Sequence, residues 1–184
     1  MSVTVSAGPR QPRPLRHLAS AVSILTVRHS GRPHGTTVGT VTAVSQRPPL
    51  LGVCLRIGST FAQLAMAEGR FVVNVLDASQ TGLARRFADR ARADGAEQFT
   101  DVPWNPDPCT GAPLLAGALA HYSCRVLALP RVGDHDVLLG RVTRAAAHQG
   151  VPLLSYAGDM FAGAIPSAAA CGAPARNRKE NIAT

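Results

Sequence analysis

Polar and apolar residues alternate in short runs through most of this chain, and turn-forming residues separate the runs. β-Branched residues are frequent in these runs, which is typical of strands that bury one face. The run at 50–55 is apolar throughout and predicts a strand that is buried on both faces. Together the runs predict seven strands, over residues 22–28, 36–45, 50–55, 71–76, 118–130, 136–147 and 151–156.

Three further stretches have the spacing or the flanking residues of short helices. Residues 15–21 follow a proline, which is well placed at the start of a helix. Ser59 or Thr60 can cap a helix over the segment FAQLAMA. Residues 80–93 predict an amphipathic helix, because apolar side chains four residues apart share one face.

Turns that contain glycine join the predicted strands into hairpins. HSGRP follows the first strand, and Gly133-Asp134 separates the two longest strands. Gly39 interrupts the second predicted strand and indicates a bulge or the close approach of another segment. Strands do not alternate with helices along the chain. We therefore expect a mainly β fold, an antiparallel barrel with helices at its edge.

The chain is basic, with a formal net charge of +8, but most of the excess lies at its two ends. Residues 1–14 and 166–184 lack hydrophobic periodicity and are predicted to be disordered tails around one folded domain at 15–165. Aromatic side chains, which stack on bases in nucleic-acid-binding proteins, make up only 4% of the chain. The composition therefore favours an anionic small ligand over nucleic acid.

The apolar runs and the cysteines indicate in which cellular compartment the protein is expected. No run of 18 apolar residues predicts a membrane span, and no apolar segment near the first residue indicates a signal peptide. The cysteines at 54, 109, 124 and 171 lack the spacing of a metal site. Cys54 and Cys124 stand in apolar runs and are expected to be buried, unreactive thiols. Such thiols fit a reducing compartment, and we predict a cytoplasmic protein.

Two segments rich in hydroxyl groups are candidates for an anion site, although the common nucleotide-binding loops are absent. Residues 35–45, GTTVGTVTAVS, combine threonine hydroxyls with glycine backbone N–H groups. Residues 54–60, CLRIGST, end a predicted strand, place Arg56 after it and open a helix with Ser59 and Thr60. Both segments also have a structural interpretation, since threonine favours strands and serine caps helices.

Two more polar positions are candidates for function. Asn74 lies inside the apolar run FVVNVL, where its amide needs partners from the backbone or from a ligand. His135 stands between Asp134 and Asp136. A metal site there is disfavoured, because adjacent side chains of an extended chain point in different directions. Two alternatives remain, an acid–base group and a turn histidine held by a neighbouring aspartate.

The ordered series of segments resembles the flavin reductase-like family of FMN-binding split barrels, which are the reductase partners of two-component flavin monooxygenases. The resemblance spans residues 15–156 and rests on LASAVSILTV, GRPHGTTVGTVTAVS, RPPLLGVCL, GSTFAQL, GRFVVNVL, LARRFAD, GAPLLAGALAHYSCRV and GDHDVLLGRV. It implies a mainly β, six-stranded antiparallel Greek-key split barrel with short flanking helices. It also implies a homodimer with a flavin near the interface.

The resemblance further implies which residues contact the flavin. Those expected at its phosphate and ribityl chain are Thr36, Thr37, Val38, Gly39, Thr40, Ser59 and Thr60. Those expected near its ring system are Cys54, Leu55, Arg56 and Asn74, and the remaining flavin-binding candidates are Phe87 and Tyr156. His135 is expected to face the cleft where the flavin and a nicotinamide stack, and no metal is implied.

The chain departs from the family pattern at two places. The family's TVSSF is TVGTV here, so a hydroxyl is lost at Gly39 and an aromatic ring at Val41. The family's closing PLLYxxGxY is PLLSYAGDMF, so Ser155 replaces a tyrosine that is displaced to Tyr156. These departures motivate an alternative, a split-barrel protein that keeps its flavin for another reaction or only carries it.

The activity implied by the resemblance is hydride transfer from NADH or NADPH to FMN or FAD, and the reduced flavin then leaves for a partner monooxygenase. Because the cofactors carry the chemistry, the protein must stack two rings and exclude water. His135 is then predicted to orient the nicotinamide. The nicotinamide preference stays open, because Arg32, Arg56 and Arg131 are all able to meet a 2′-phosphate.

Overall fold

The computed structural model describes residues 17–163 and confirms a mainly β fold. The main sheet is antiparallel, and its strands follow the order β3-β2-β6-β9-β11-β5-β4, with the short β10 paired to β11. This path holds seven strands, one more than the resemblance implies. The strands are β2 Ser23–His29, β3 Arg32–Val38, β4 Thr42–Gln46, β5 Pro49–Arg56, β6 Arg70–Val75, β9 Ala120–Ala128, β10 Arg131–Val132 and β11 His135–Ala147.

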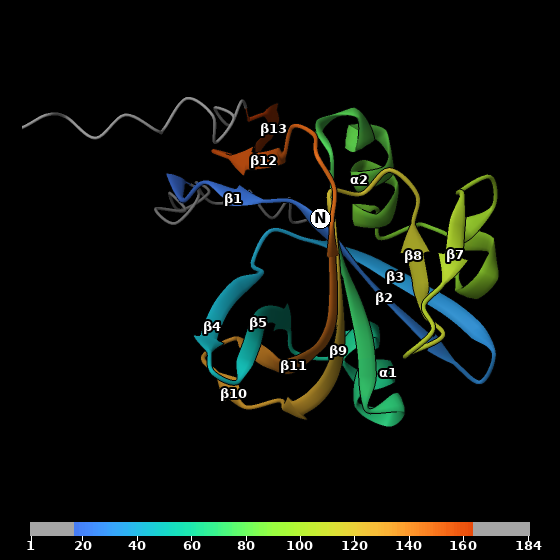
Figure 1. The fold of residues 1–184 in the computed structure, drawn as a ribbon, viewed down its shortest axis with the longest axis vertical. Helices are drawn as coiled ribbons and strands as arrows, with labels where there is room; N and C mark the ends of the chain where they lie inside the picture. Colours follow the sequence, from blue (N-terminus) through green and yellow to red (C-terminus); the bar gives the residue numbers. More distant parts are fainter. Residues whose placement is uncertain (1–16, 164–184) are drawn as a thin grey trace, which may run out of the picture.

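Side-chain alternation decides which residues of the curled sheet face the core. Figure 1 shows the sheet folded into a barrel, with β9 and β11 running along it as long strands. In β9, Tyr122, Cys124 and Val126 pack with the core inside the barrel. His121 and Ser123, which alternate with them, contact the segment 107–115 on the outside instead. In β9 the inward face is therefore apolar and the outward face polar, whereas Ile24 on the outward face of β2 packs in a second apolar cluster with Phe87 and Leu115.

The barrel is split between β3 and β4, where we predicted one continuous strand over 36–45. Within residues 17–163, the sheet pairs β3 only with β2 and β4 only with β5. The chain turns away from β2 at Gly39 and crosses to β5. There the Thr40 hydroxyl donates to the Cys54 carbonyl oxygen at 3.0 Å and accepts from the Cys54 N–H at 3.2 Å. The prediction of a close approach at Gly39 is confirmed, because a Cβ there would lie 3.2 Å from the Ser20 hydroxyl oxygen, whereas the prediction of a single strand is wrong.

Two helices flank the barrel. The helix α1 (Thr60–Glu68) begins where predicted, with the Ser59 hydroxyl accepting from the N–H of Ala62, and Gly69 ends it in the left-handed region. The helix α2 (Thr81–Ala88) follows the 3₁₀ turn η2 (Ala78–Gln80) and ends five residues before the predicted 93. Asp89 is extended, so the chain leaves the helix there. In Figure 1, α1 lies at the lower end of the barrel and α2 near its upper end.

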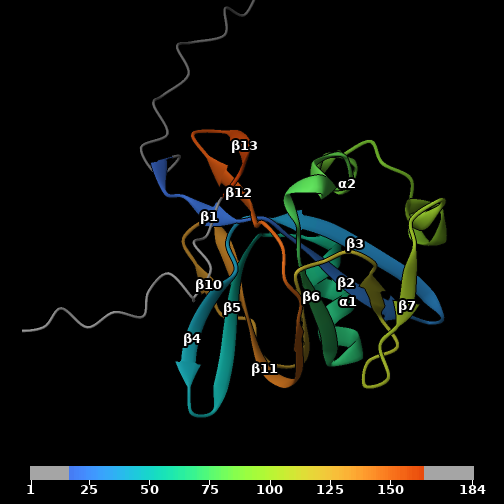
Figure 2. The ribbon, with the colours of Figure 1, turned by 45° about the horizontal axis from the view of Figure 1, so that its top comes forward.

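Two small sheets complete the described part of the chain. One has the order β1-β12-β13, with β1 Ser20–Ala21, β12 Leu153–Tyr156 and β13 Asp159–Ala162. The other pairs β7 (Trp104–Pro106) with β8 (Pro113–Leu115), after the 3₁₀ turn η3 (Gly95–Phe99). The β4–β5 hairpin and the β7 segment lie on opposite sides of the molecule (Figure 2). The strands β7, β8 and β13 were not predicted.

The helix predicted over 15–21 is wrong where the structure describes it. Ser20 and Ala21 pair with Ser155 and Leu154 of β12. Pairing with a strand more than 130 residues away overrides the local preference, because an open sheet edge leaves backbone groups without partners. The predicted tails at 1–14 and 166–184 lie outside the described residues.

The strand β5 also differs from its prediction. The run 50–55 was expected to be buried on both faces, but Cys54 is exposed while its neighbours Val53 and Leu55 are buried. One face of β5 therefore reaches the surface, because the split leaves it uncovered.

Within 17–163, no helix is long and apolar enough to cross a membrane.

Candidate functional site

A cleft of about 680 Å³ opens at the split of the barrel. Its walls are the end of β3, the end of β5, the N-terminal turn of α1 and the first residue of β11. The predicted site residues that line it are Thr36, Thr37, Val38, Gly39, Thr40, Cys54, Leu55, Arg56, Ser59, Thr60 and His135. Segments that are separate in the sequence thus form one concave surface.

Strand pairing brings these segments together. His135 of β11 stands opposite Arg56 of β5 in the antiparallel register. The two hydrogen bonds of Thr40 with the backbone of Cys54 hold the end of β3 against the same part of β5. The chain then runs from Arg56 directly into the start of α1. The cleft is therefore built on rigid elements and not on long loops.

The cleft is suited to an anion. The N-terminus of α1 opens into it, where free backbone N–H groups and the helix dipole favour negative charge. Arg56, Arg90 and Arg92 line it, and among the described residues no aspartate or glutamate does. Of the three arginines proposed for a nicotinamide 2′-phosphate, Arg56 lines the cleft, and Arg32 and Arg131 do not.

Reasoning from the sequence missed three ionisable residues of this cleft, His34, Arg90 and Arg92. His34 and Arg92 each carry a buried nitrogen without a hydrogen-bond partner, Nε2 and Nε respectively. Alternation in β3 places His34 on the same face as Thr36, so the sequence held a signal for it. The two arginines stand in the polar stretch after α2, where no local pattern indicates that the chain returns to the cleft.

His135 lies at the rim of the cleft, with its side chain about two-fifths exposed. Its Nδ1 contacts the Asp134 carboxylate at 2.7 Å. That hydrogen bond and the nearby imidazole charge lower the pKa of Asp134 below its usual value. Asp136 is buried and pairs with the Nε of Arg131 at 3.2 Å. The two aspartates thus have separate partners, and only Asp134 orients the histidine.

Three predicted site residues are not brought to the cleft. Asn74 is fully buried, donates to the Ile24 carbonyl oxygen and the Thr26 hydroxyl, and accepts from the Leu115 N–H. Phe87 is fully buried and packs against Phe99. Tyr156 is exposed in β12 and contacts the ring of His17. The Asn74 amide ties β6 to β2 and β8, which is the backbone alternative considered for it.

The four cysteines differ more than their sequence context indicates. Cys124 is buried as predicted, and burial raises the pKa of its thiol to about 12. Cys54 and Cys109 are exposed, and Cys54 lines the cleft. The expected burial of Cys54 is therefore wrong, because β5 has an open face at the split. Cys171 lies outside the described residues.

Alkylation offers a direct check of the cleft. In a Cys109→Ser/Cys171→Ser background, we expect N-ethylmaleimide to modify Cys54, which is exposed, and to leave Cys124 unmodified, because Cys124 is buried and burial raises the pKa of its thiol. A ligand in the cleft should slow the modification several-fold. Peptide mass spectrometry reads both sites. Modification of Cys124 at the rate of Cys54 would contradict the described burial.

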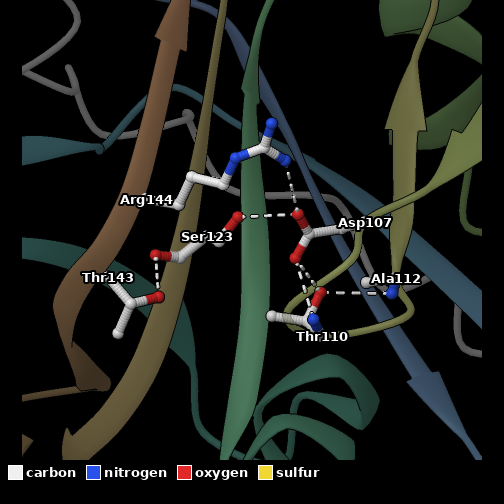
Figure 3. Close-up of polar contacts among 6 residues, drawn as sticks. All are labelled: Asp107, Thr110, Ala112, Ser123, Thr143 and Arg144. Carbon is white, nitrogen blue, oxygen red and sulfur yellow. Dashed lines mark hydrogen bonds and ion pairs between the residues drawn. The ribbon is translucent and has the colours of Figure 1, made fainter.

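A second cavity, of about 530 Å³, lies outside the barrel between β8, β9 and β11. Three of its polar residues, Asp107, Ser123 and Arg144, are already paired with one another, as Figure 3 shows. The fully buried Asp107 carboxylate accepts from the hydroxyls of Ser123 and Thr110 and from the Thr110 N–H, and Arg144 lies 3.6 Å away. No residue predicted from the sequence lines this cavity. The cleft with unpaired donors is therefore the stronger candidate.

Over most of its length the chain is similar to proteins of known function. Residues 15–164 match the family model of the flavin reductase like domain. The chain is 38% identical over 152 residues to an NADH-dependent FAD reductase of Streptomyces globisporus, covering 81% of each. It is 38% identical over 144 residues to the reductase component of 4-nitrophenol 4-monooxygenase/4-nitrocatechol 2-monooxygenase of Rhodococcus opacus, covering 77% of this chain and 74% of that one. The solved flavin reductase component of a bacterial two-component tryptophan halogenase superposes with a TM-score of 0.78 at 31% identity, over 83% of this chain and 95% of that chain.

Proposed function

The chain belongs to the flavin reductase like domain family, and on that premise we propose that it is an NAD(P)H-dependent flavin reductase that supplies reduced flavin to a partner monooxygenase. The observation that carries the proposal is the cleft at the barrel split. It gathers hydroxyls, arginines and a helix N-terminus without any acidic residue of the described chain.

The residues of the cleft fit a flavin nucleotide. Its volume of about 680 Å³ lies in the range of small-molecule sites. The buried donors of His34 and Arg92, which have no partner among the described residues, call for acceptors from a ligand. A flavin phosphate supplies such acceptors, and the apolar side chain of Leu55, which also lines the cleft, is suited to a ring system.

We assign the two ends of the cleft on chemical grounds. Thr36–Thr40, Ser59 and Thr60 are proposed to hold the phosphate and ribityl chain, and Cys54–Arg56 to border the ring. When bound, the flavin accepts a hydride from the nicotinamide. The chain's own contribution is to hold both rings in contact and to exclude water, which requires no nucleophile. His135, opposite Arg56, is proposed to orient the nicotinamide.

Two of the departures from the family pattern, Gly39 and Ser155, lie close together in the structure. A Cβ at Gly39 would lie 3.2 Å from the Ser20 hydroxyl oxygen and 3.9 Å from the Cβ of Ser155. Glycine at position 39 leaves room for Ser20 and Ser155, which pack against it. The alternative of a protein that only carries flavin is separated from the reductase by the assay that follows.

The test is to mix the purified protein, in the absence of oxygen, with an excess of FMN or FAD and with NADH or NADPH, and to follow nicotinamide oxidation by absorbance. We expect many turnovers of free flavin with at least one pairing. Oxidation that stops after one equivalent of bound flavin would instead indicate a protein that keeps its flavin. No oxidation with any of the four pairings would overturn the proposal.

A homodimer and a cytoplasmic location remain predictions. The dimer is supported by large apolar side chains that are exposed in the single chain, such as Val44, Leu127 and Val132. The molar mass of the protein in solution, measured by light scattering, would decide between a monomer and a homodimer.

A further inference from the structure

His34 is a buried histidine of β3 whose ring is only partly satisfied. The residue is 6% exposed and lines the cleft, and its ring lies beside that of Phe61 in the first turn of α1, 6.4 Å between centroids. Its Nε2 is buried and has no hydrogen-bond partner among the described residues. Buried polar atoms without a hydrogen-bond partner are rare, so the state of Nε2 requires an explanation.

The hydrogen-bond chain around Gly35 decides which nitrogen of His34 carries the proton. The Gly35 N–H donates to Oε1 of Gln98 at 2.8 Å, which fixes the orientation of that amide. Nε2 of Gln98 then donates to Nδ1 of His34 at 3.3 Å. Because Nδ1 accepts, the proton of the neutral ring lies on Nε2. His34 thus presents a donor to the cleft.

The ring is neutral in the free protein. Burial, and then the charge of Arg92, lower the pKa of His34 below its usual value, against a smaller opposite effect of Asp94. The donor is therefore an uncharged N–H whose direction is set by Gln98.

Arg92 supplies a second donor of the same kind. Its guanidinium is held by backbone oxygens, with Nη1 donating to Asp89 at 2.7 Å and Nη2 donating to Gly35 at 3.2 Å. Its Nε is buried and has no partner among the described residues. His34 and Arg92 are both tied to the peptide of Gly35, one through Gln98 and one directly. Two preoriented donors therefore line the cleft near the N-terminus of α1.

We propose that His34 is a phosphate-binding residue of the flavin site, and that its Nε2–H and the Nε–H of Arg92 donate hydrogen bonds to the phosphate of the bound flavin. The proposal rests on the flavin reductase function proposed above. A phosphate is favoured over a carbonyl group because a helix N-terminus and arginines surround these donors and no described acidic residue lines the cleft.

The first experiment compares FMN with riboflavin, which has the same ring and ribityl chain but no phosphate. For His34→Leu, we expect the dissociation constant of FMN to rise about ten- to a hundredfold, as for the loss of a hydrogen bond to a charged group. The constant for riboflavin should be unchanged. His34→Gln, which keeps an N–H donor, should recover most of the FMN affinity.

The matched control is His29→Leu, because His29 is half-exposed and pairs with Glu68 away from the cleft. It should leave both dissociation constants unchanged. Flavin fluorescence quenching measures all of them. Equal losses for FMN and riboflavin in His34→Leu, or no loss for either, would overturn the proposal.

The second experiment uses the unsubstituted protein, because His34→Leu also removes the acceptor of the Gln98 amide. With ¹⁵N-labelled histidine, NMR should show His34 as the Nε2–H tautomer, with its signal shifting on addition of FMN but not of riboflavin. An Nδ1–H tautomer, or identical spectra with both ligands, would contradict the proposal. Normal flavin turnover with an unresponsive His34 would overturn this inference alone, whereas a protein that neither binds nor reduces flavin would overturn the function as well.

Discussion

Replacing His135 by alanine is expected to lower the rate of flavin reduction by several-fold to about a hundredfold, while the protein stays folded. The histidine stands at the rim of the cleft, opposite Arg56, and Asp134 holds its Nδ1. The carboxylate accepts from Nδ1–H, so this contact fixes the orientation of the imidazole ring. Loss of the side chain removes a contact that positions the nicotinamide, but no buried packing.

Rapid-mixing measurements of flavin reduction, with the KM for the nicotinamide taken separately, would check this expectation. Asp134→Ala should show a smaller loss in the same direction, because it frees the imidazole without removing it. His148→Ala is the matched control, since His148 lines the second cavity. An unaffected rate in His135→Ala, or a loss in His148→Ala instead, would place the nicotinamide elsewhere.

Replacing Asp107 by alanine is expected to lower the free energy of unfolding by roughly 3–5 kcal/mol, because several buried donors lose their acceptor. The Asp107 side chain has no exposed surface and accepts from Ser123 and twice from Thr110. These bonds tie the segment after β7 to β9, and Figure 3 shows the side chains converging on the carboxylate. In a domain of this size the loss corresponds to a fall in Tm of about 6–20 °C.

Unfolding by urea, followed by circular dichroism, would measure the change. Asp107→Asn should be intermediate, since it keeps the shape and one acceptor oxygen but not the charge. Asp94→Ala is the matched control, because Asp94 is exposed and its side chain makes no capping hydrogen bond. A stability of Asp107→Ala equal to that of the control would show that the network does not hold the segment.

The strands of the barrel were largely predictable because their signal is local. Short runs rich in apolar and β-branched residues identify β2, β5, β6, β9 and β11 within a few residues of their observed bounds. The start of α1 was predictable for the same reason, since the Ser59 cap lies next to the helix that it starts. Its neighbour α2 was predicted too long, because the polar residues after Ala88 do not mark where the helix ends.

Hydroxyls, glycines and the family resemblance predicted many residues of the cleft. They did not predict its ionisable residues His34, Arg90 and Arg92. Asn74 was a candidate because a buried amide needs hydrogen-bond partners, and Ile24, Thr26 and Leu115 supply them, which is the first of the two alternatives considered for it. Cys54 was expected to be buried because its run is apolar, and it is exposed. Sequence patterns decide neither case, because they do not show which face of a strand another segment covers.

The sequence by itself determined most strands of the barrel, the helix cap at Ser59 and the family to which the chain belongs, because each depends on residues close together or in a fixed order. Only the tertiary structure decided that β1 pairs with β12, that β3 and β4 part at Gly39, and that Arg92 returns to His34. These features join segments that are distant along the chain. Their free energy comes from backbone pairing and burial that exist only after the barrel has closed.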